Sequence, residues 1–221
     1  MRKTKFVTGE YYHIYNRGTD KRDIFLCEDD IQRFFLGMSE FNSTELTGSI
    51  YERKLVKKKL GSLAPKGLPL VMFVAYCLNP NHYHFVIKQI AENGVSKFMH
   101  RLGSGYTNYF NEKYKRSGGL FQGTYKAIHI SSNEYLLHLS VYVNLNFKVH
   151  GLGSLAPKLY RSSWGEYIGG GEEKEQFCMK EIILDQFSAR QDYETYCKET
   201  LIDIVQRKEN KKGLQELLLE A

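Results

Sequence analysis

Two β-prone runs with only a short turn between them constrain the fold of this chain more than any other feature. Residues 70–78 form a continuous apolar run, which is typical of a buried strand at the centre of a sheet. The segment Asn79-Pro80-Asn81 has turn composition, and residues 82–87 are again β-prone. This pattern predicts an antiparallel hairpin at the centre of a sheet.

The second run begins with two histidines one residue apart. Side chains alternate along a strand, so His82 and His84 share one face while Tyr83, Phe85 and Ile87 share the other. Two neutral imidazoles held side by side form half of a metal site. Taken alone, such a pair is more often two exposed or hydrogen-bonded histidines without a functional role. A metal site is therefore indicated only if other residues of the chain support it.

The other periodic segments predict the fold class. We expect strands at residues 11–17 and 125–130, and helices at residues 24–41 and 94–114. The resulting β-α-β-β-α-β order predicts an α+β, ferredoxin-like fold, with an antiparallel sheet and helices on one face. The opposite face is then expected to be free. Such a fold hosts many functions, so it assigns none by itself.

The chain divides into a main domain and an extension. We expect the main domain at residues 1–151, with a surface insertion at about 42–68, and a helical extension at 152–221 that contacts DNA. The hexapeptide Gly-Ser-Leu-Ala-Pro-Lys at 61–66 recurs at 153–158, which is too short for a structural repeat.

Composition limits the class of protein. The net charge of +6 and the pI near 9.0 indicate a tendency to bind polyanions. No apolar run approaches the length of a membrane helix, so we expect a cytoplasmic protein without a membrane partner. The four cysteines are scattered without a Cys-x-x-Cys pair, which argues against a disulfide framework or a structural zinc site.

A further helix is predicted after the last strand of the ferredoxin-like unit. Ser131 and Glu134 match a capping box, so a helix should run from there to about Phe147. One stripe of this mostly apolar helix carries polar side chains, namely Tyr135, His138, Tyr142 and Asn146. A polar stripe on a core helix indicates a cleft.

These residue types suit attack on a phosphodiester. A tyrosine hydroxyl has a pKa near 10, so attack by Tyr142 needs an in-line position and a cation that draws charge from the phosphate. His82 and His84 with Asn146 as third ligand could hold such an ion, and the amide oxygen suits magnesium or manganese at least as well as zinc. The alternative for Tyr142 is a structural role, because a single tyrosine at the edge of a core usually packs there with its hydroxyl bonded to water.

Four motifs together resemble the REP-associated tyrosine transposases, of the transposase IS200-like family of single-tyrosine HUH endonucleases. They occupy residues 12–18, 80–84, 117–123 and 142–146, and the resemblance spans residues 11–151. In that family the two histidines bind the metal, the helix tyrosine is the nucleophile and a side chain four residues later completes the metal shell. The resemblance therefore implies these roles for His82, His84, Tyr142 and Asn146.

Three positions depart from the family pattern. Asn79 stands where the family commonly has methionine, Thr124 where it has arginine and Phe147 where it has proline. The missing arginine weakens a phosphate contact and the missing proline allows a longer helix. None of the three removes the nucleophile or the histidine pair.

The resemblance implies metal-dependent nicking and rejoining of single-stranded, hairpin-forming, REP-like DNA through a 5′-phosphotyrosine intermediate. The cofactor would be Mg²⁺ or Mn²⁺, and the protein a monomer or homodimer. We expect four basic residues to contact the DNA, namely Arg17, Lys126, Arg101 and Lys115.

Three alternatives stay open. Tyr106, on the helix after the histidine strand, could be the nucleophile instead of Tyr142. The chain could be a non-catalytic DNA- or RNA-binding regulator, for which basic patches on a ferredoxin-like sheet suffice. It could also be a hydrolase that uses metal-bound water and forms no covalent protein–DNA species.

Overall fold

The computed structural model describes residues 4–45, 48, 50–60, 67–152, 159–169 and 176–219. The strands are β1 (Tyr11–Arg17), β2 (Val71–Asn79), β3 (His82–Gln89), β4 (Lys126–His129) and β5 (Arg161–Ser162). The helices are α1 (Glu28–Glu40), α2 (Ile50–Leu60), α3 (Gly94–Lys113), α4 (Asn133–Asn144), α5 (Asn146–Val149), α6 (Trp164–Ile168), α7 (Glu181–Leu184) and α8 (Arg190–Leu219). A short 3-10 turn, Thr19–Lys21, follows β1.

These strands form one antiparallel sheet in the order β4-β1-β3-β2-β5. The predicted hairpin of β2 and β3 lies near its centre, and α1 and α3 connect the strands as the β-α-β-β-α-β pattern requires. The predicted ferredoxin-like fold is confirmed. β5 adds a short edge strand, because Ser162 pairs with Cys77 at the end of β2.

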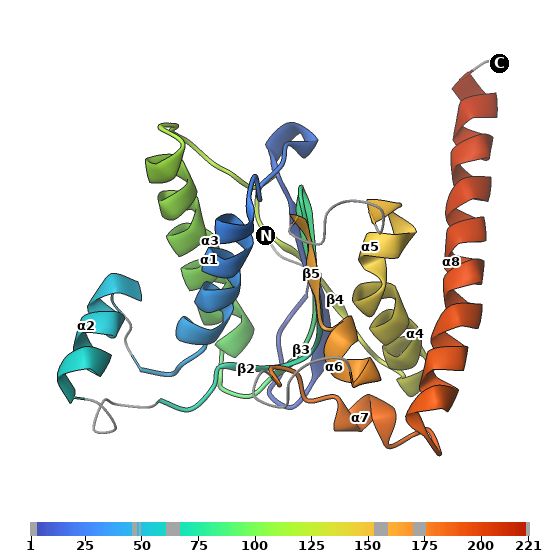
Figure 1. The fold of residues 1–221 in the computed structure, drawn as a ribbon, viewed down its shortest axis with the longest axis horizontal. Helices are drawn as coiled ribbons and strands as arrows, with labels where there is room; N and C mark the ends of the chain where they lie inside the picture. Colours follow the sequence, from blue (N-terminus) through green and yellow to red (C-terminus); the bar gives the residue numbers. More distant parts are fainter. Residues whose placement is uncertain are drawn as a thin grey trace.

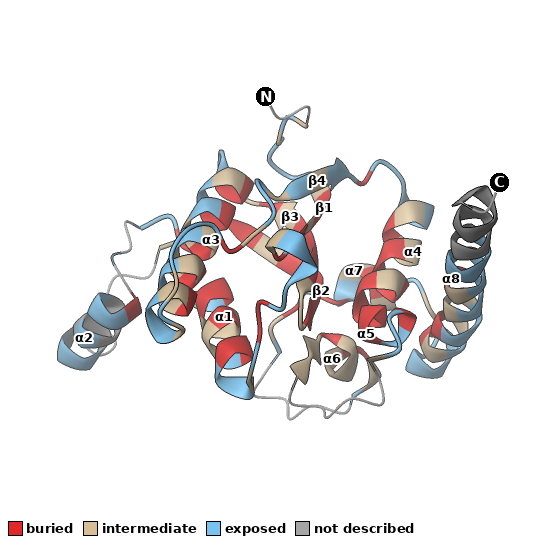
Figure 2. Ribbon diagram, turned by 90° about the horizontal axis from the view of Figure 1, so that it is seen from above, coloured by how far each residue is buried: buried red, intermediate tan, exposed pale blue. Residues whose placement is uncertain are grey.

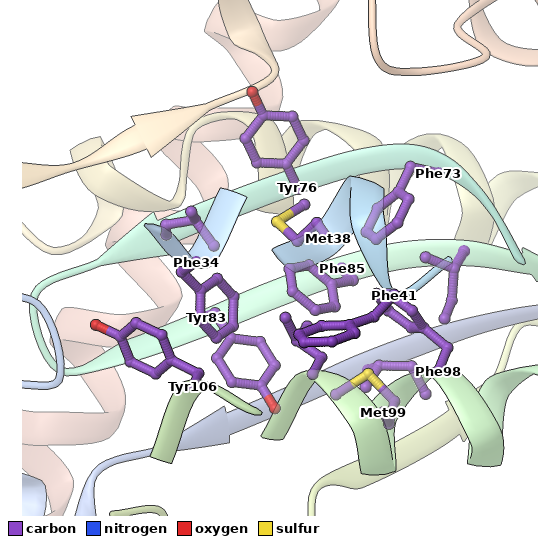
Figure 3. Packing of buried hydrophobic residues seen from close by; sticks show 14 of the residues in the cluster. Phe34, Met38, Phe41, Phe73, Tyr76, Tyr83, Phe85, Phe98, Met99 and Tyr106 are labelled. Carbon is purple, nitrogen blue, oxygen red and sulfur yellow. The ribbon is translucent and has the colours of Figure 1, made fainter. Parts of the chain in front are cut away.

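One face of the sheet packs against α1 and α3 (Figure 1). Figure 3 shows aromatic and sulfur-containing side chains from both helices closing over the strands. Phe34 of α1 meets Tyr106 of α3 edge to face, with ring centroids 4.8 Å apart, and Phe73 meets Phe85 in the same way at 5.3 Å. The predicted inward residues Tyr83, Phe85 and Ile87 all lie in this core.

The other face is also covered, which corrects the prediction that it is free. Helices α4 to α8 pack over it, and Figure 2 shows buried residues on both sides of the sheet. The register of β2 shifts between Phe73 and Ala75, and Val74 and Ala75 both join this second core. The apolar continuity of residues 70–78 therefore reflects a strand that is buried on two faces.

Helix α4 starts one residue later than predicted and ends earlier. Its N-cap is Ser132, whose hydroxyl accepts from the backbone N–H of Tyr135 at 3.2 Å. Ser132 has the extended backbone that a cap needs, whereas Ser131 lies outside the helix. The chain leaves helical geometry at Leu145 (φ −108°, ψ 16°), so Asn146 begins the separate helix α5.

The insertion and the extension are both partly helical. The predicted insertion at residues 42–68 contains α2, and both copies of the repeated hexapeptide, at 61–66 and 153–158, lie outside the described residues. In the extension, the hydroxyl of Ser163 accepts from the backbone N–H of Tyr76 at 2.8 Å, which ties this part to the sheet. The domain boundary at residue 151 stays a prediction. Among the described helices, none is both long enough and apolar enough to cross a membrane.

Candidate active site

The β2–β3 hairpin presents His82 at the edge of the second core. The carbonyl of Pro80 accepts from the backbone N–H groups of Ile24 and Phe25, which fixes the turn. His82 Nδ1 lies 2.5 Å from Asn81 Oδ1, and this oxygen can only accept, so Nδ1 carries the proton. His82 Nε2 is then unprotonated, which is the form that binds a metal, and the side-chain nitrogen of Asn79 lies 2.9 Å from it.

Asn146 lies directly opposite His82 Nε2. Its Oδ1 is 3.0 Å from His82 Nε2, and the side chains of Asn146 and of Asn79 are completely buried. Neighbouring ligands on an octahedral ion with bonds of about 2.1 Å are roughly 3.0 Å apart. The buried Nδ2 of Asn146 has no partner, so this amide is not tied to the protein by its nitrogen. These residues therefore fit a divalent ion.

His84 lies on the same face of the sheet as His82. It contacts His13, a histidine that the sequence patterns did not indicate as a site residue. His84 Nδ1 lies 2.9 Å from Nε2 of His13 on β1, and the rings of His13, His84 and Tyr15 are stacked. If His84 donates from Nδ1, its Nε2 keeps a lone pair for a metal, and His13 acts as the orienting partner. The rings of His82 and His84 have centroids 5.3 Å apart.

Burial keeps these imidazoles neutral. Burial lowers the pKa of His13 to about 4, and it lowers the pKa of His82 and, more strongly, of His84. Neutral imidazole is the form that ligates metal ions, so the histidines are ready to bind an ion at neutral pH.

Tyr142 of α4 lies against the histidine pair. Its ring meets the His84 ring edge to face, with centroids 5.4 Å apart, and it lies 6.2 Å from the His13 ring. Burial raises the pKa of the Tyr142 hydroxyl, and the nearby side chain of Asn146 partly offsets the rise. The hydroxyl is therefore protonated at neutral pH, and attack by it requires help from a cation or a base.

His150 and Lys208 also reach the site, and the sequence analysis did not predict either. The His150 ring lies 4.7 Å from the His82 ring, edge to face. Lys208 of α8 donates to the carbonyl of Val149 at 2.7 Å and to His150 Nδ1 at 3.3 Å. Burial, followed by the charges of His82 and Lys208, lowers the pKa of His150 to about 4. The spacing of His150, four residues after Asn146, is the signal that could have indicated it.

The alternative nucleophile Tyr106 lies elsewhere. It is buried between α1 and α3 on the opposite face of the sheet, and its hydroxyl donates to the carbonyl of Ile24 at 2.5 Å. Burial and the nearby charge of Asp30 raise its pKa. These contacts place Tyr106 in the structural core, away from the histidine pair.

Two of the four predicted DNA contacts flank the site. Arg17 pairs across the sheet with His82 and bonds the side chain of Gln122, and the Lys126 ammonium lies 6.0 Å from the Tyr15 ring centre. Arg101, by contrast, lies on α3 and donates to the carbonyls of Ser43 and Glu45. Lys115 is exposed just after α3. The structure does not bring Arg101 and Lys115 to the histidine pair.

Part of this chain is similar to a known protein family. The family described as "Transposase IS200 like" matches residues 69–146, a segment that contains the histidine pair, Tyr142 and Asn146. Among curated proteins, none matches this sequence. Of the solved structures, one described as "Structure of the REP associates tyrosine transposase bound to a REP hairpin" has a TM-score of 0.52 and 11% sequence identity. That similarity covers 76% of this chain and 85% of the other, and it supports the same fold. Residues 69–146 of this chain are therefore similar to the IS200-like transposase family, and the fold as a whole resembles that of the solved transposase structure.

Proposed function

We propose that this protein nicks and rejoins single-stranded DNA beside a hairpin-forming, REP-like repeat, with Tyr142 as the nucleophile. The Tyr142 oxygen forms a bond to phosphorus and the bond from phosphorus to the 3′ oxygen breaks. The products are a 5′-phosphotyrosine and a free 3′-hydroxyl, which receives the proton that the tyrosine loses. Attack of the 3′-hydroxyl reverses the step and rejoins the strand.

The observation that carries this proposal is the convergence of four side chains from three separate elements. Tyr142 lies 5.4 Å from the His84 ring, and His82 Nε2 lies 3.0 Å from Asn146 Oδ1. His82 and His84 come from β3, Tyr142 from α4 and Asn146 from α5. A core that needed only packing would not collect neutral imidazoles, a buried amide and a tyrosine hydroxyl in one place.

A divalent cation, Mg²⁺ or Mn²⁺, completes the proposed site. When bound, such an ion polarises the scissile phosphate and draws off the charge that develops on it. His82, His84 and Asn146 would hold it. The Tyr142 ring is kept in place by its edge-to-face contact with His84, so the nucleophile and the metal ligands share one rigid support.

The proposed substrate follows from charge and from the solved relative. The basic side chains Arg17, Lys126 and Lys208 surround the site and can contact phosphates. The structural neighbour is described as bound to a REP hairpin, and we transfer this class of DNA to the present chain as part of the proposal.

A covalent-adduct experiment tests the nucleophile. A hairpin oligonucleotide with single-stranded flanks, labelled at its 3′ end, is incubated with protein and Mn²⁺ and run on a denaturing gel. The label should migrate with the protein, whereas a 5′ label should appear on a released fragment. Tyr142→Phe should abolish the adduct because it removes only the attacking oxygen, and Tyr135→Phe, two turns earlier on α4, is the matched control.

Each alternative function predicts a different set of labelled products on the gel. A hydrolase that uses metal-bound water gives cleaved DNA without a protein-linked label, and a non-catalytic binding protein gives neither product. An adduct that persists in Tyr142→Phe would show that another residue is the nucleophile.

A further inference from the structure

Asn79 lies across the hairpin from His82, and its amide contacts both proposed metal ligands. Its Nδ2 is 2.9 Å from His82 Nε2 and 2.7 Å from Asn146 Oδ1, while those two atoms are 3.0 Å apart. We propose that Asn79 is a further ligand of the divalent ion, binding through its amide oxygen beside His82 and Asn146. This inference rests on the metal site of the proposed function, and it assigns that site a residue that departs from the family pattern.

The three atoms have the spacing of metal ligands. The ligands on one face of an octahedral ion, with bonds of about 2.1 Å, form a triangle with edges of roughly 3.0 Å. The triangle formed by His82 Nε2, Asn146 Oδ1 and Asn79 Nδ2 has edges of 2.7 to 3.0 Å. The side chain of Asn79 thus lies within ligand-to-ligand distance of both proposed ligands.

Without an ion, the two neighbouring acceptors explain why the side-chain nitrogen of Asn79, and not its oxygen, faces His82 and Asn146. His82 Nε2 is an acceptor because its Nδ1 donates to Asn81, and Asn146 Oδ1 is also an acceptor. Two lone pairs 3.0 Å apart repel each other unless positive charge lies between them or nearby. The N–H₂ of Asn79 supplies that partial positive charge, so without an ion it is the stable orientation.

A bound ion would reverse the preferred orientation of the Asn79 amide, and the side chain has no room to move away from the ion. The side chain is fully buried and its backbone is paired with His82 in the hairpin, so the amide must stay next to the ion. An N–H₂ directed at a cation is repelled, whereas a half-turn about the Cβ–Cγ bond presents the carbonyl oxygen, which is attracted.

The surroundings of Asn79 tolerate both orientations. Its Oδ1 accepts a weak hydrogen bond from the Cys77 thiol at 3.4 Å. Burial raises the pKa of this thiol to about 12, so it stays neutral. A neutral thiol is a weak donor and also a weak acceptor, and it can therefore face either the oxygen or the N–H₂ of the amide.

The available donors also favour a second amide oxygen. Within the described residues, no three His, Cys, Asp or Glu side chains converge so as to hold an ion. An ion at His82 therefore depends on amide oxygens, and each one added shifts the preference toward Mg²⁺ and Mn²⁺ and away from zinc.

The test measures binding of Mn²⁺ to the full chain without DNA, by isothermal titration calorimetry. Asn79→Met should raise the dissociation constant by about tenfold or more, because it removes an oxygen ligand while filling the same space. Asn144→Met, the loss of an equally buried amide that bonds Tyr193 and Ser163, is the matched control and should leave the dissociation constant unchanged.

A second variant covers the case in which Asn79→Met does not fold by circular dichroism. Asn79→Asp keeps the shape and places a carboxylate oxygen at the ligand position, so it should bind Mn²⁺ more tightly than the wild type. Unchanged or tighter binding in a folded Asn79→Met, or weaker binding in Asn79→Asp, overturns the assignment of Asn79 alone. Absence of Mn²⁺ binding in the wild type overturns the metal site of the proposed function as well.

Discussion

Four imidazoles form a connected row beside the sheet. His13 bonds His84, the His84 and His82 rings have centroids 5.3 Å apart, and His82 lies 4.7 Å from His150. A proton on any one of them would repel a proton on the next, and burial disfavours the charge on all four. The row is therefore stable only while it is neutral, which is also the state that binds a metal.

This neutrality predicts a loss of stability in mild acid. Histidine in the unfolded chain has a pKa near 6.5, whereas the pKa of His13 and of His150 is about 4 in the folded protein. Below pH 6.5 the unfolded chain therefore binds more protons than the folded one, and the free energy of unfolding falls as the pH drops from about 6.5 toward 4. Above pH 6.5 these groups contribute no pH dependence.

Calorimetry of the metal-free protein checks this prediction. The melting temperature should be nearly constant between pH 7 and 8 and should fall below pH 6.5. His13→Gln, which has no titrating ring, should show a shallower fall than the wild type, and His100→Gln, at an exposed position on α3, should follow the wild type. Equal slopes for His13→Gln and the wild type would contradict a buried, neutral His13.

Some of these residues were predictable from spacing and others were not. His82 and His84 share a face because side chains alternate along a strand, so periodicity alone brings this pair together. Tyr142 and Asn146 were expected one turn apart on a single helix, but the break at Leu145 places Asn146 at the start of α5. The contacts of His13 with His84 and of Asn79 with Asn146 depend on strand register and on the approach of α5 to the sheet. Spacing along the sequence carries no information about either.

At the scale of elements, α4 is the helix that places Tyr142, the proposed nucleophile, beside the His84 ring. Its cap bond runs from the backbone N–H of Tyr135 to the Ser132 hydroxyl, at 3.2 Å. The sequence predicted the helix but placed the cap at Ser131, because Glu134 stands three residues after it as in a capping box. Which of the two serines is the cap depends on backbone angles that this pattern does not contain. The end at Leu145 was missed for the same reason, since Leu145 carries no helix-stop signal.

Mutation of the two serines separates these cap assignments. Ser132→Ala should lower the free energy of unfolding by about 1 kcal/mol, because one backbone N–H of the first turn loses its partner. In a chain of this size, a loss of about 1 kcal/mol corresponds to a melting temperature lower by about 2–4 °C. Ser131→Ala is the control and should have little effect in the same thermal scan. A larger loss for Ser131→Ala would restore the cap that the sequence pattern indicated.

For the whole molecule, the order of strands was predictable and the second helix layer was not. The pattern of residues 11–130 fixes a β-α-β-β-α-β unit, and the fold has it. The cover on the second face comes from α4 to α8. Of these helices, α5, α6 and α7 are too short to show a period, and the apolar periodicity of α4 and α8 is weak. Only the buried run of β2, apolar on both faces, indicated that a second layer was needed.

This second layer connects the C-terminal extension to the site through Lys208. The extension at 152–221 is predicted to contact DNA, and its Lys208 lies at the end of α5, where its Nζ bonds the Val149 carbonyl and His150. Its charge lowers the pKa of both His82 and His150, so it acts within the site. A cation fixed there is well placed to attract the phosphate that Tyr142 would attack in the proposed reaction.

Lys208 should therefore contribute one phosphate contact to DNA binding. Measured by fluorescence anisotropy on a labelled hairpin with single-stranded flanks, Lys208→Gln should weaken binding at low salt. It should also reduce the slope of log K against log salt by about 0.7, the value for one contact to a single strand. Lys198→Gln, exposed on the same helix, carries the same change of charge and is the matched control. If both variants change the slope equally, the effect is one of net charge, and Lys208 makes no contact of its own with the DNA.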